Sequence, residues 1–132
     1  MMKSLSKISQ NAFKKYISIL VLCAFSCGSR NHANQSGFRS TTVSYYADRF
    51  DGNKTASGAT YRHSRMTASN KTLAFGTRVE IINPENQKSV IITVNDRGPL
   101  KPSRAFDLSQ GAFKKIANLE EGIVPVKYRI LK

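Results

Sequence analysis

Two aspartates and an arginine stand at the ends of apolar segments, where a carboxyl group can exchange a proton with a bound substrate. Residues 90–99 (VIITVNDRGP) run from an apolar, β-branched stretch into Asp96, Arg97 and a Gly-Pro turn. Asp107 follows within a second apolar segment, residues 106–109 (FDLS). A strand end is a rigid place from which to project an acid or base into a cleft. The alternative is that Asp96 caps a turn and Asp107 caps the helix that follows.

The elements that must position these aspartates are mostly strands. β-branched, aromatic or alternating residues predict strands at residues 41–47, 77–82, 89–94, 105–108 and 124–131. A turn at residues 83–88 (NPENQK) joins two of them as a hairpin. Ser109 is placed to cap a short helix over residues 110–118. A long polar loop, residues 48–65, has the length of a functional or mobile segment. Five or six strands and one short helix predict a small β-barrel.

The amino terminus has the features of an export signal. Four lysines precede residues 16–25 (YISILVLCAF), an apolar run that is too short to span a membrane, so residues 1–26 are predicted to be a signal peptide. Residues 26–29 (SCGS) are similar to a lipoprotein processing site, which predicts lipidation of Cys27. The alternative is an ordinary signal peptide in which Cys23 and Cys27 are incidental.

The remainder of the chain is predicted to be a polar, flexible tether, residues 27–39, followed by one small domain, residues 40–132. We expect a monomer. Removal of residues 1–26 takes four of the 21 lysines and arginines and none of the 8 acidic residues, which leaves a net charge of +9. For an exported protein this charge favours anionic wall polymer or lipid headgroups as partners. Because the basic residues are scattered singly, without an aromatic platform, we expect no nucleic-acid binding.

The sequence predicts neither a metal site nor a cofactor. Both cysteines lie in the targeting region, so the domain has none to offer as ligands. The sequence also lacks a phosphate-binding loop and a nucleophile elbow.

A set of ordered motifs resembles the rare lipoprotein A family of bacterial septal wall enzymes, and through it the double-psi β-barrel shared with expansins. The motifs are residues 44–47 (SYYA), 55–58 (TASG), 66–77 (MTASNKTLAFGT), the two aspartate segments 94–99 and 106–109, and 122–126 (GIVPV). The resemblance implies an all-β fold, a six-stranded double-psi β-barrel with one or two short helices.

The resemblance also implies an activity. The family is similar to lytic transglycosylases, lyases that cut the glycan strands of peptidoglycan, prefer strands stripped of stem peptides and leave 1,6-anhydro ends. Cell wall remodelling and daughter-cell separation would be the setting. The protein would be anchored by its lipid to the cell membrane or outer membrane and face the wall, with division-machinery proteins as further partners.

Roles for individual residues follow from the same resemblance. Asp96 is the expected acid, because one carboxyl can protonate the glycosidic oxygen and later assist attack by the sugar's own 6-hydroxyl. The other predicted catalytic positions are Asp107 and Asn70. The predicted substrate contacts are Tyr46, Thr67, Lys71 and Arg97.

Two positions depart from the family pattern. Asn70 stands where the family usually has histidine, and Ala59 stands where it usually has glutamate. Asn70 can hydrogen-bond a sugar or orient Asp96, but it cannot carry a proton at neutral pH. His63, in the long loop, could substitute for the missing histidine or could simply be solvated. These losses leave open a non-catalytic, expansin-like lipoprotein that binds peptidoglycan.

Aromatic residues offer faces on which a sugar ring could stack. The candidates are Tyr45, Tyr46 and Tyr61, and alternation along a strand allows only one of Tyr45 and Tyr46 to leave the core. Arg97 is expected to pair with Asp107 or with a backbone carbonyl rather than to contact substrate directly.

Overall fold

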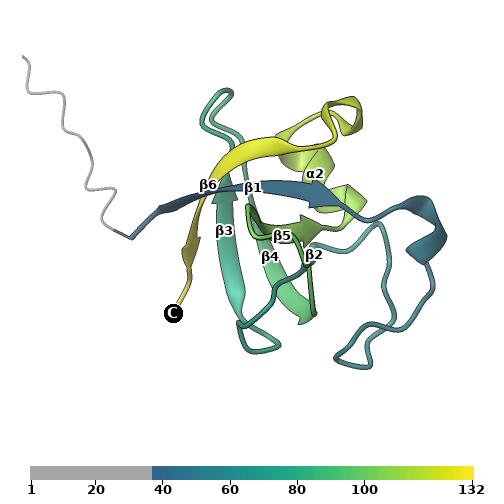
Figure 1. Cartoon of the computed structure of the whole chain (residues 1–132). Coiled ribbons are helices and arrows are strands. Elements are labelled where there is room, and N and C mark those ends of the chain that lie inside the picture. Colours follow the sequence, from purple (N-terminus) through teal and green to yellow (C-terminus); the bar gives the residue numbers. More distant parts are fainter. Residues whose placement is uncertain (1–36) are drawn as a thin grey trace, which may run out of the picture. The chain divides into compact units, whose positions relative to one another are not determined.

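Six strands close into a barrel in the order β1-β5-β2-β4-β3-β6 (Figure 1). The computed structural model describes residues 37–132. The strands are β1 (Arg39–Tyr45), β2 (Thr67–Ser69), β3 (Arg78–Ile82), β4 (Ser89–Asp96), β5 (Arg104–Leu108) and β6 (Val124–Ile130). They are accompanied by the 3₁₀ helices η1 (Asp48–Phe50) and η2 (Leu119–Glu121) and the α-helix α2 (Gln110–Ile116). The predicted signal peptide and Cys27 lie outside the described residues.

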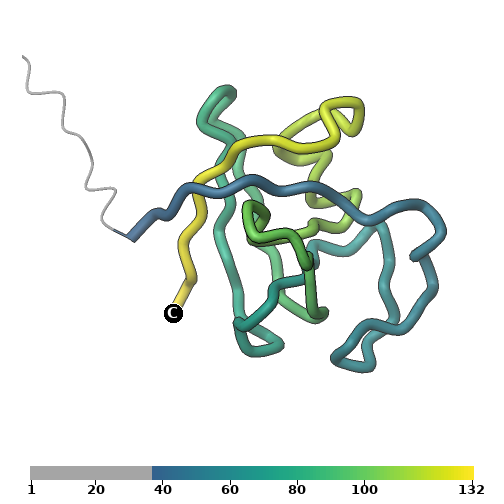
Figure 2. The backbone as a smooth tube through the Cα atoms, in the orientation of Figure 1, coloured from purple at the N-terminus to yellow at the C-terminus, as the bar shows by residue number. Residues whose placement is uncertain are grey.

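Strand pairing brings the ends of strands that are distant in sequence to the same edge. β1 with β5 and β2 with β4 are parallel pairs, while the other four pairings around the barrel are antiparallel. Parallel neighbours need long connections, and here β2 and β4 are connected through β3, while β1 and β5 are connected through β2, β3 and β4. The chain between β1 and β2 forms a long loop at one side of the barrel (Figure 2). Because β2 and β4 run in the same direction, the residues that follow each of them emerge together.

The core follows from the alternation of the strands and from one face of α2. In β4, Val90, Ile92 and Val94 point inward and are buried. Phe113 and Ile116 of α2 are fully buried in the same cluster. Burying an aliphatic or aromatic side chain of this size stabilises the fold by about 1.5–3 kcal/mol, so the barrel interior supplies most of the driving force for folding.

Most predicted elements are present, with shifts at their ends. Ser109 caps α2 by accepting a hydrogen bond from the Ala112 N–H, as predicted, but the helix ends two residues early because Ala117 is extended. β1 begins at Arg39, the last residue of the predicted tether, where it pairs with Tyr128. No helix within residues 37–132 is long and apolar enough to cross a membrane.

The strand that sequence reasoning did not locate is β2. Its three residues, Thr67–Ser69, show the burial pattern intermediate, buried, buried rather than alternation, and they lie inside a polar segment. β2 is a strand because β4 and β5 flank it on both sides. Tertiary pairing therefore decides its structure.

Candidate active site

The register of four adjacent strands aligns two serines and the two predicted aspartates, a set called here the polar row. Ser44 of β1 pairs with Asp107 of β5, Asp107 pairs with Ser69 of β2, and Ser69 pairs with Asp96 of β4. Neighbouring strands are about 4.8 Å apart, so the backbones of the two aspartates lie about 10 Å apart. The structure thus brings Asp96 and Asp107 together across a single intervening strand, and Ser69, which sequence analysis did not single out, lies between them.

Three donors hold the carboxylate of Asp96. Its Oδ2 accepts a 2.7 Å hydrogen bond from the Tyr46 hydroxyl. Its Oδ1 accepts from the backbone N–H groups of Ala56, at 2.8 Å, and Arg97, at 2.9 Å. The long loop is also held at this point, because the Ser57 N–H donates to the Asn95 carbonyl at 3.3 Å. Asp96 is therefore fixed in orientation by a side chain, by the loop and by its own neighbour.

Tyr46 is the tyrosine of the adjacent pair that leaves the core. Its ring stacks on Tyr61, with centroids 4.4 Å apart, and meets Phe50 edge-on at 5.7 Å. Burial, followed by the hydrogen bond to Asp96, raises the pKa of Tyr46 well above its ordinary value. Tyr46 therefore stays protonated at neutral pH, and its hydroxyl donates a hydrogen bond to the carboxylate. Tyr45 instead packs on Phe113 at 4.8 Å and belongs to the core.

The prediction that Tyr61 could stack on a sugar ring is wrong, because only 2% of this residue is exposed. Its hydroxyl oxygen accepts from the Gln110 N–H at 3.3 Å and lies 2.8 Å from His63 Nδ1. The other ring nitrogen of His63, Nε2, lies 3.8 Å from Asp48 Oδ1. Burial raises the pKa of Tyr61 to about 12. His63 consequently supports Tyr61 under the ring of Tyr46, in contrast to the suggested proton shuttle.

Asn70 is an anchor of the backbone, with only 8% of the residue exposed. Its Nδ2 donates to the Ala105 carbonyl at 3.0 Å, and its Oδ1 accepts from the N–H groups of Thr72 and Leu73 at 3.0 and 2.8 Å. It meets Asp96 through the backbone, where the Asn70 N–H donates to the Asp96 carbonyl oxygen at 3.0 Å. We expected the Asn70 side chain to orient the Asp96 carboxylate, but in the structure the Tyr46 hydroxyl does so.

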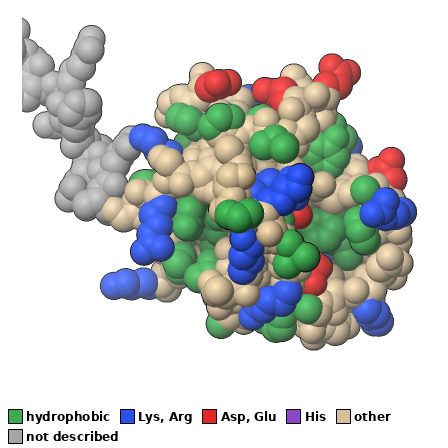
Figure 3. Space-filling model, in the orientation of Figure 1, with side chains coloured by type: hydrophobic (Ala, Val, Ile, Leu, Met, Phe, Trp, Pro, Cys, Tyr) green, Lys and Arg blue, Asp and Glu red, His purple; other side chains and the backbone are tan. Residues whose placement is uncertain are grey.

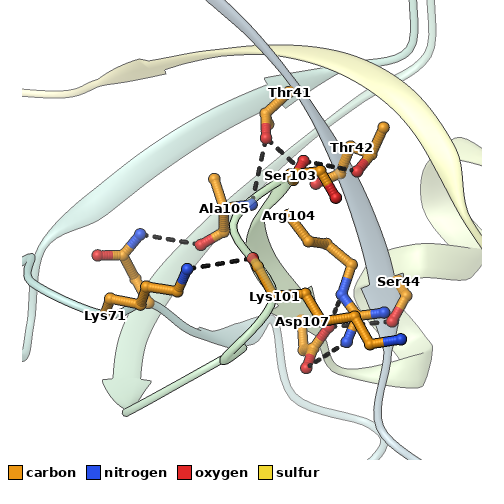
Figure 4. A network of polar contacts seen from close by, with 10 residues as sticks. Thr41, Thr42, Ser44, Lys71, Lys101, Ser103, Arg104, Ala105 and Asp107 are labelled. Carbon is orange, nitrogen blue, oxygen red and sulfur yellow. Dashed lines mark hydrogen bonds and ion pairs between the residues drawn. The ribbon is translucent and has the colours of Figure 1, made fainter.

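Asp107 is neutralised by Arg104, a residue that sequence reasoning missed (Figure 4). Arg104 Nε lies 3.0 Å from Asp107 Oδ1, and the Ser44 hydroxyl donates to the same oxygen at 3.0 Å. The suggested pairing of Arg97 with Asp107 is wrong, and the suggested carbonyl contact is correct. Arg97 Nη1 donates to the carbonyls of Asn70, at 3.2 Å, and Leu73, at 2.8 Å.

The two remaining predicted substrate contacts, Lys71 and Thr67, differ in their exposure to solvent. Lys71 is exposed and its Nζ donates to the Lys101 carbonyl at 3.1 Å (Figure 4). Thr67 lies two residues before Ser69 in β2 and pairs with Thr93, and its carbonyl accepts from the Ser109 N–H at 2.8 Å. The Thr67 hydroxyl is buried and has no hydrogen-bond partner within residues 37–132. The structure therefore places Lys71 at the edge of the site and Thr67 beneath it.

The chemistry available at this site is that of one oriented carboxyl group beside a neutralised one. Across residues 37–132, no three His, Cys, Asp or Glu side chains are grouped to hold a metal ion. Asp96 can exchange a proton at Oδ2, where Tyr46 is its partner. Ser44, which is half-buried, adds a hydroxyl group that suits a polyhydroxylated ligand, whereas Ser69 is buried.

Comparison with protein families identifies one match over most of the barrel. A family model described as lytic transglycolase matches residues 39–128. A relative from Pseudomonas aeruginosa (strain UCBPP-PA14), named endolytic peptidoglycan transglycosylase RlpA, is 46% identical over 86 residues, which are 65% of this chain and 25% of the relative. A Nostoc relative, named a probable enzyme of the same kind, is 40% identical over 91 residues, 67% of this chain and 24% of its own. The chain spans about a quarter of the length of these curated relatives.

Solved structures confirm the fold. The apo expansin of Clavibacter michiganensis superimposes with a TM-score of 0.58 at 21% identity, covering 72% of this chain and 50% of the expansin chain. A Streptomyces papain inhibitor gives a TM-score of 0.59 at 23% identity, covering 72% of this chain and 94% of the inhibitor. The barrel is accordingly the double-psi β-barrel that the sequence predicts.

Proposed function

We propose that this chain, which belongs to the lytic transglycolase family, cuts peptidoglycan glycan strands endolytically and leaves 1,6-anhydro ends. The observation that carries the proposal is the Asp96 carboxylate, held at the end of β4 by Tyr46, Ala56 and Arg97. The names of the relatives support the same reaction. A wall substrate in turn implies a location outside the cytoplasm.

In the proposed reaction, Asp96 gives a proton to the glycosidic oxygen as the bond from that oxygen to the anomeric carbon breaks. The 6-hydroxyl of the same sugar then forms the new bond to the anomeric carbon, and its proton passes to Asp96. Neither water nor a second carboxylate is consumed, in contrast to hydrolytic glycosidases. The three donors around Asp96 stabilise its negative charge while the proton is on the leaving group.

The other residues of the site have supporting roles in this proposal. Asp107, paired with Arg104, provides a fixed charge and, with Ser44, an acceptor and donor for sugar hydroxyls. Asn70 holds the segment that follows β2 and takes no part in proton transfer. Asp96 is then the single proton donor of the polar row.

A second candidate function is peptidoglycan binding without cleavage. The observation that favours it is the presence of Ala59 and Asn70 at positions where the family usually carries groups that titrate. Both functions predict affinity for glycan strands, and product analysis distinguishes them.

The decisive experiment is digestion of purified peptidoglycan, native and amidase-treated, with mass analysis for 1,6-anhydro muropeptides. We expect the parent protein to produce them and Asp96→Asn to lower their rate at least about a hundredfold. The asparagine carbonyl can still accept from Ala56 and Arg97, so the melting temperature should change little. Glu85→Gln, at an exposed position of the 83–88 turn, is the control with the same loss of charge. Unchanged cleavage by Asp96→Asn would contradict the mechanism, and glycan binding without any product from the parent would establish the second function.

We also propose that Cys27 carries the lipid that retains the protein at a membrane. Removal of the thiol removes the acylation site, so Cys27→Ala should move the protein to the soluble fraction, as measured by membrane fractionation and immunoblotting. Cys23→Ala is the matched control and should stay with the membrane. Equal retention of both variants would refute the anchor. Association with division-machinery proteins and a monomeric state remain part of this proposal.

A further inference from the structure

We propose that Lys71, Arg97 and Lys101 form a carboxylate-binding subsite beside the polar row. These three residues are called here the cationic edge. This inference rests on the proposed function, because it assigns the chemical group of the glycan substrate that these cations recognise. The three residues lie in segments next to the ends of strands, and the role proposed for Asp96 is unchanged.

Strand direction places the three cations at one edge of the barrel. Lys71 lies two residues beyond the end of β2, and Arg97 directly follows the end of β4. Because β2 and β4 are parallel, both residues emerge on the same side. Lys101 lies in the segment that enters β5, which is antiparallel to β2, so this segment starts at that side as well. The contact from Lys71 Nζ to the Lys101 carbonyl, at 3.1 Å, confirms that the two segments meet (Figure 4).

Two of these cations are restrained without being neutralised. Arg97 donates to the carbonyls of Asn70 and Leu73 and lies 4.0 Å from the centre of the Phe75 ring. Lys71 donates to a carbonyl of the 97–103 segment. Backbone carbonyls and an aromatic ring carry no net charge, and the ion pairs found within residues 37–132 involve neither cation. Their charges are thus left to attract an anion.

Arg104, unlike Lys71 and Arg97, has its charge neutralised by an ion pair. It lies in β5 next to the same edge, but its guanidinium is paired with Asp107.

A cation that is already held in place loses less side-chain freedom when it binds. Lys71 has two further N–H donors and Arg97 has its Nε and second terminal nitrogen, all of which suit carboxylate oxygens. On the face seen in Figure 3, Lys and Arg side chains gather over β1, β5 and β2 around recessed acidic side chains.

The carboxylate can come from two sources within peptidoglycan. Every N-acetylmuramic acid carries a lactyl group, whose carboxylate is free where the stem peptide has been removed. In native strands that group is an amide, and the carboxylates belong to the peptide. An oligomer of N-acetylglucosamine has neither, although its sugar rings are otherwise alike. Three probes therefore separate recognition of the ring from recognition of the acid and of its source.

The test measures affinity of the mature chain for amidase-treated strands, native peptidoglycan and chitohexaose, at low salt and at about 0.15 M salt. We expect amidase-treated strands, or native ones if the peptide is the source, to bind about five- to tenfold more tightly than chitohexaose, with the advantage reduced by salt. Lys71→Gln combined with Lys101→Gln should remove that advantage and leave chitohexaose binding unchanged. Lys71→Arg, which keeps the charge and a donor, should retain it. Melting temperatures show that each variant is folded.

The control is Lys88→Gln combined with Lys114→Gln, which removes the same charge from exposed positions in the 83–88 turn and in α2. If the control lowers binding of the acidic strands as much as the Lys71 and Lys101 variant does, attraction is non-specific and the subsite is refuted. A parent that binds chitohexaose and the acidic strands equally also refutes the subsite, while the proposed function stands. A parent that neither binds nor cleaves any glycan refutes the proposed function itself.

Discussion

At the scale of single residues, the site depends on how one carboxylate is held. The Tyr46 hydroxyl, the Ala56 N–H and the Arg97 N–H come from three separate places in the chain and meet at Asp96. Tyr46 is itself held by stacking on buried Tyr61. Because both rings are fixed by packing, Asp96 keeps one orientation before substrate arrives, which is what preorganised catalysis requires.

Tyr46→Phe tests this positioning. The change removes one hydrogen bond to Asp96 and keeps the stacked ring, so we expect kcat to fall about tenfold with little change in KM. Unfolding free energy should fall by about 1 kcal/mol. Steady-state rates of anhydro-product release, with urea denaturation of the same variant, measure both quantities. Tyr46→Ala, which also removes the stacking partner of Tyr61, should lose more stability.

Asn70→Ala gives the comparison for a structural residue. Loss of its side chain leaves the N–H groups of Thr72 and Leu73 and the Ala105 carbonyl without their partner, so stability should fall much more than in Tyr46→Phe. Any loss of activity should then follow the fraction unfolded. If Asn70→Ala abolishes cleavage while its stability is unchanged, the assignment of Asn70 as an anchor is wrong.

At the scale of elements, the start of α2 and the long loop support each other. The Gly111 N–H donates to the His63 carbonyl at 2.7 Å, and the Ser109 hydroxyl donates to the Arg65 carbonyl. A Cβ on Gly111 would lie 2.5 Å from the His63 oxygen and 3.0 Å from Met66 Cε. The helix and loop can approach this closely only because residue 111 has no side chain.

Gly111→Ala should therefore separate the helix from the loop. We expect unfolding free energy to fall by about 1–3 kcal/mol, as in other overpacked interiors, which urea denaturation measures. Cleavage should fall as well, because the same loop carries Ala56 to the Asp96 carboxylate. Lys114→Ala, on the exposed side of the same helix, should stay within about 0.5 kcal/mol of the parent. Equal stability of Gly111→Ala and the parent would show that the loop is free to move away.

At the scale of the whole molecule, a closed barrel with two buried or half-buried tyrosines should respond to alkaline pH. The pKa of Tyr46 and that of Tyr61 are both raised in the folded state, chiefly by burial, the latter to about 12. In the unfolded chain both phenols ionise near their ordinary pKa of about 10. Unfolding above that pH therefore releases protons. The stability that these neutral phenols provide is complete below pH 10 and is lost as pH rises through the folded pKa values.

Urea denaturation between pH 8 and pH 11.5 should show this loss. The expected slope above pH 10 approaches about 1.4 kcal/mol per pH unit for each tyrosine that stays protonated in the fold. Tyr61→Phe removes one of the two phenols and should make the slope shallower, although its stability at pH 8 will be lower. An identical slope in the parent and in Tyr61→Phe would mean that Tyr61 is not the group that titrates.

Much of the barrel was predictable because its signals are local. Five of the six strands, the 83–88 turn and the Ser109 cap each depend on neighbouring residues, whose alternation or capping geometry is written in a short segment. The three residues of β2 carry too little pattern, and only their pairing with β4 and β5 makes them a strand. The ordered motifs likewise predicted the fold that the solved structures confirm.

The fold class and the carboxylates of interest could be inferred from the amino-acid sequence, because strand alternation and short motifs are properties of contiguous residues. Which distant groups meet, in contrast, depends on the tertiary contacts. Tyr46 rather than Asn70 holds the Asp96 carboxylate, Arg104 rather than Arg97 pairs with Asp107, and Tyr61 is buried. These contacts depend on strand register and on the return of the long loop across the barrel. Both are set when the barrel closes and packs its core, and neither leaves a signature in the neighbouring sequence.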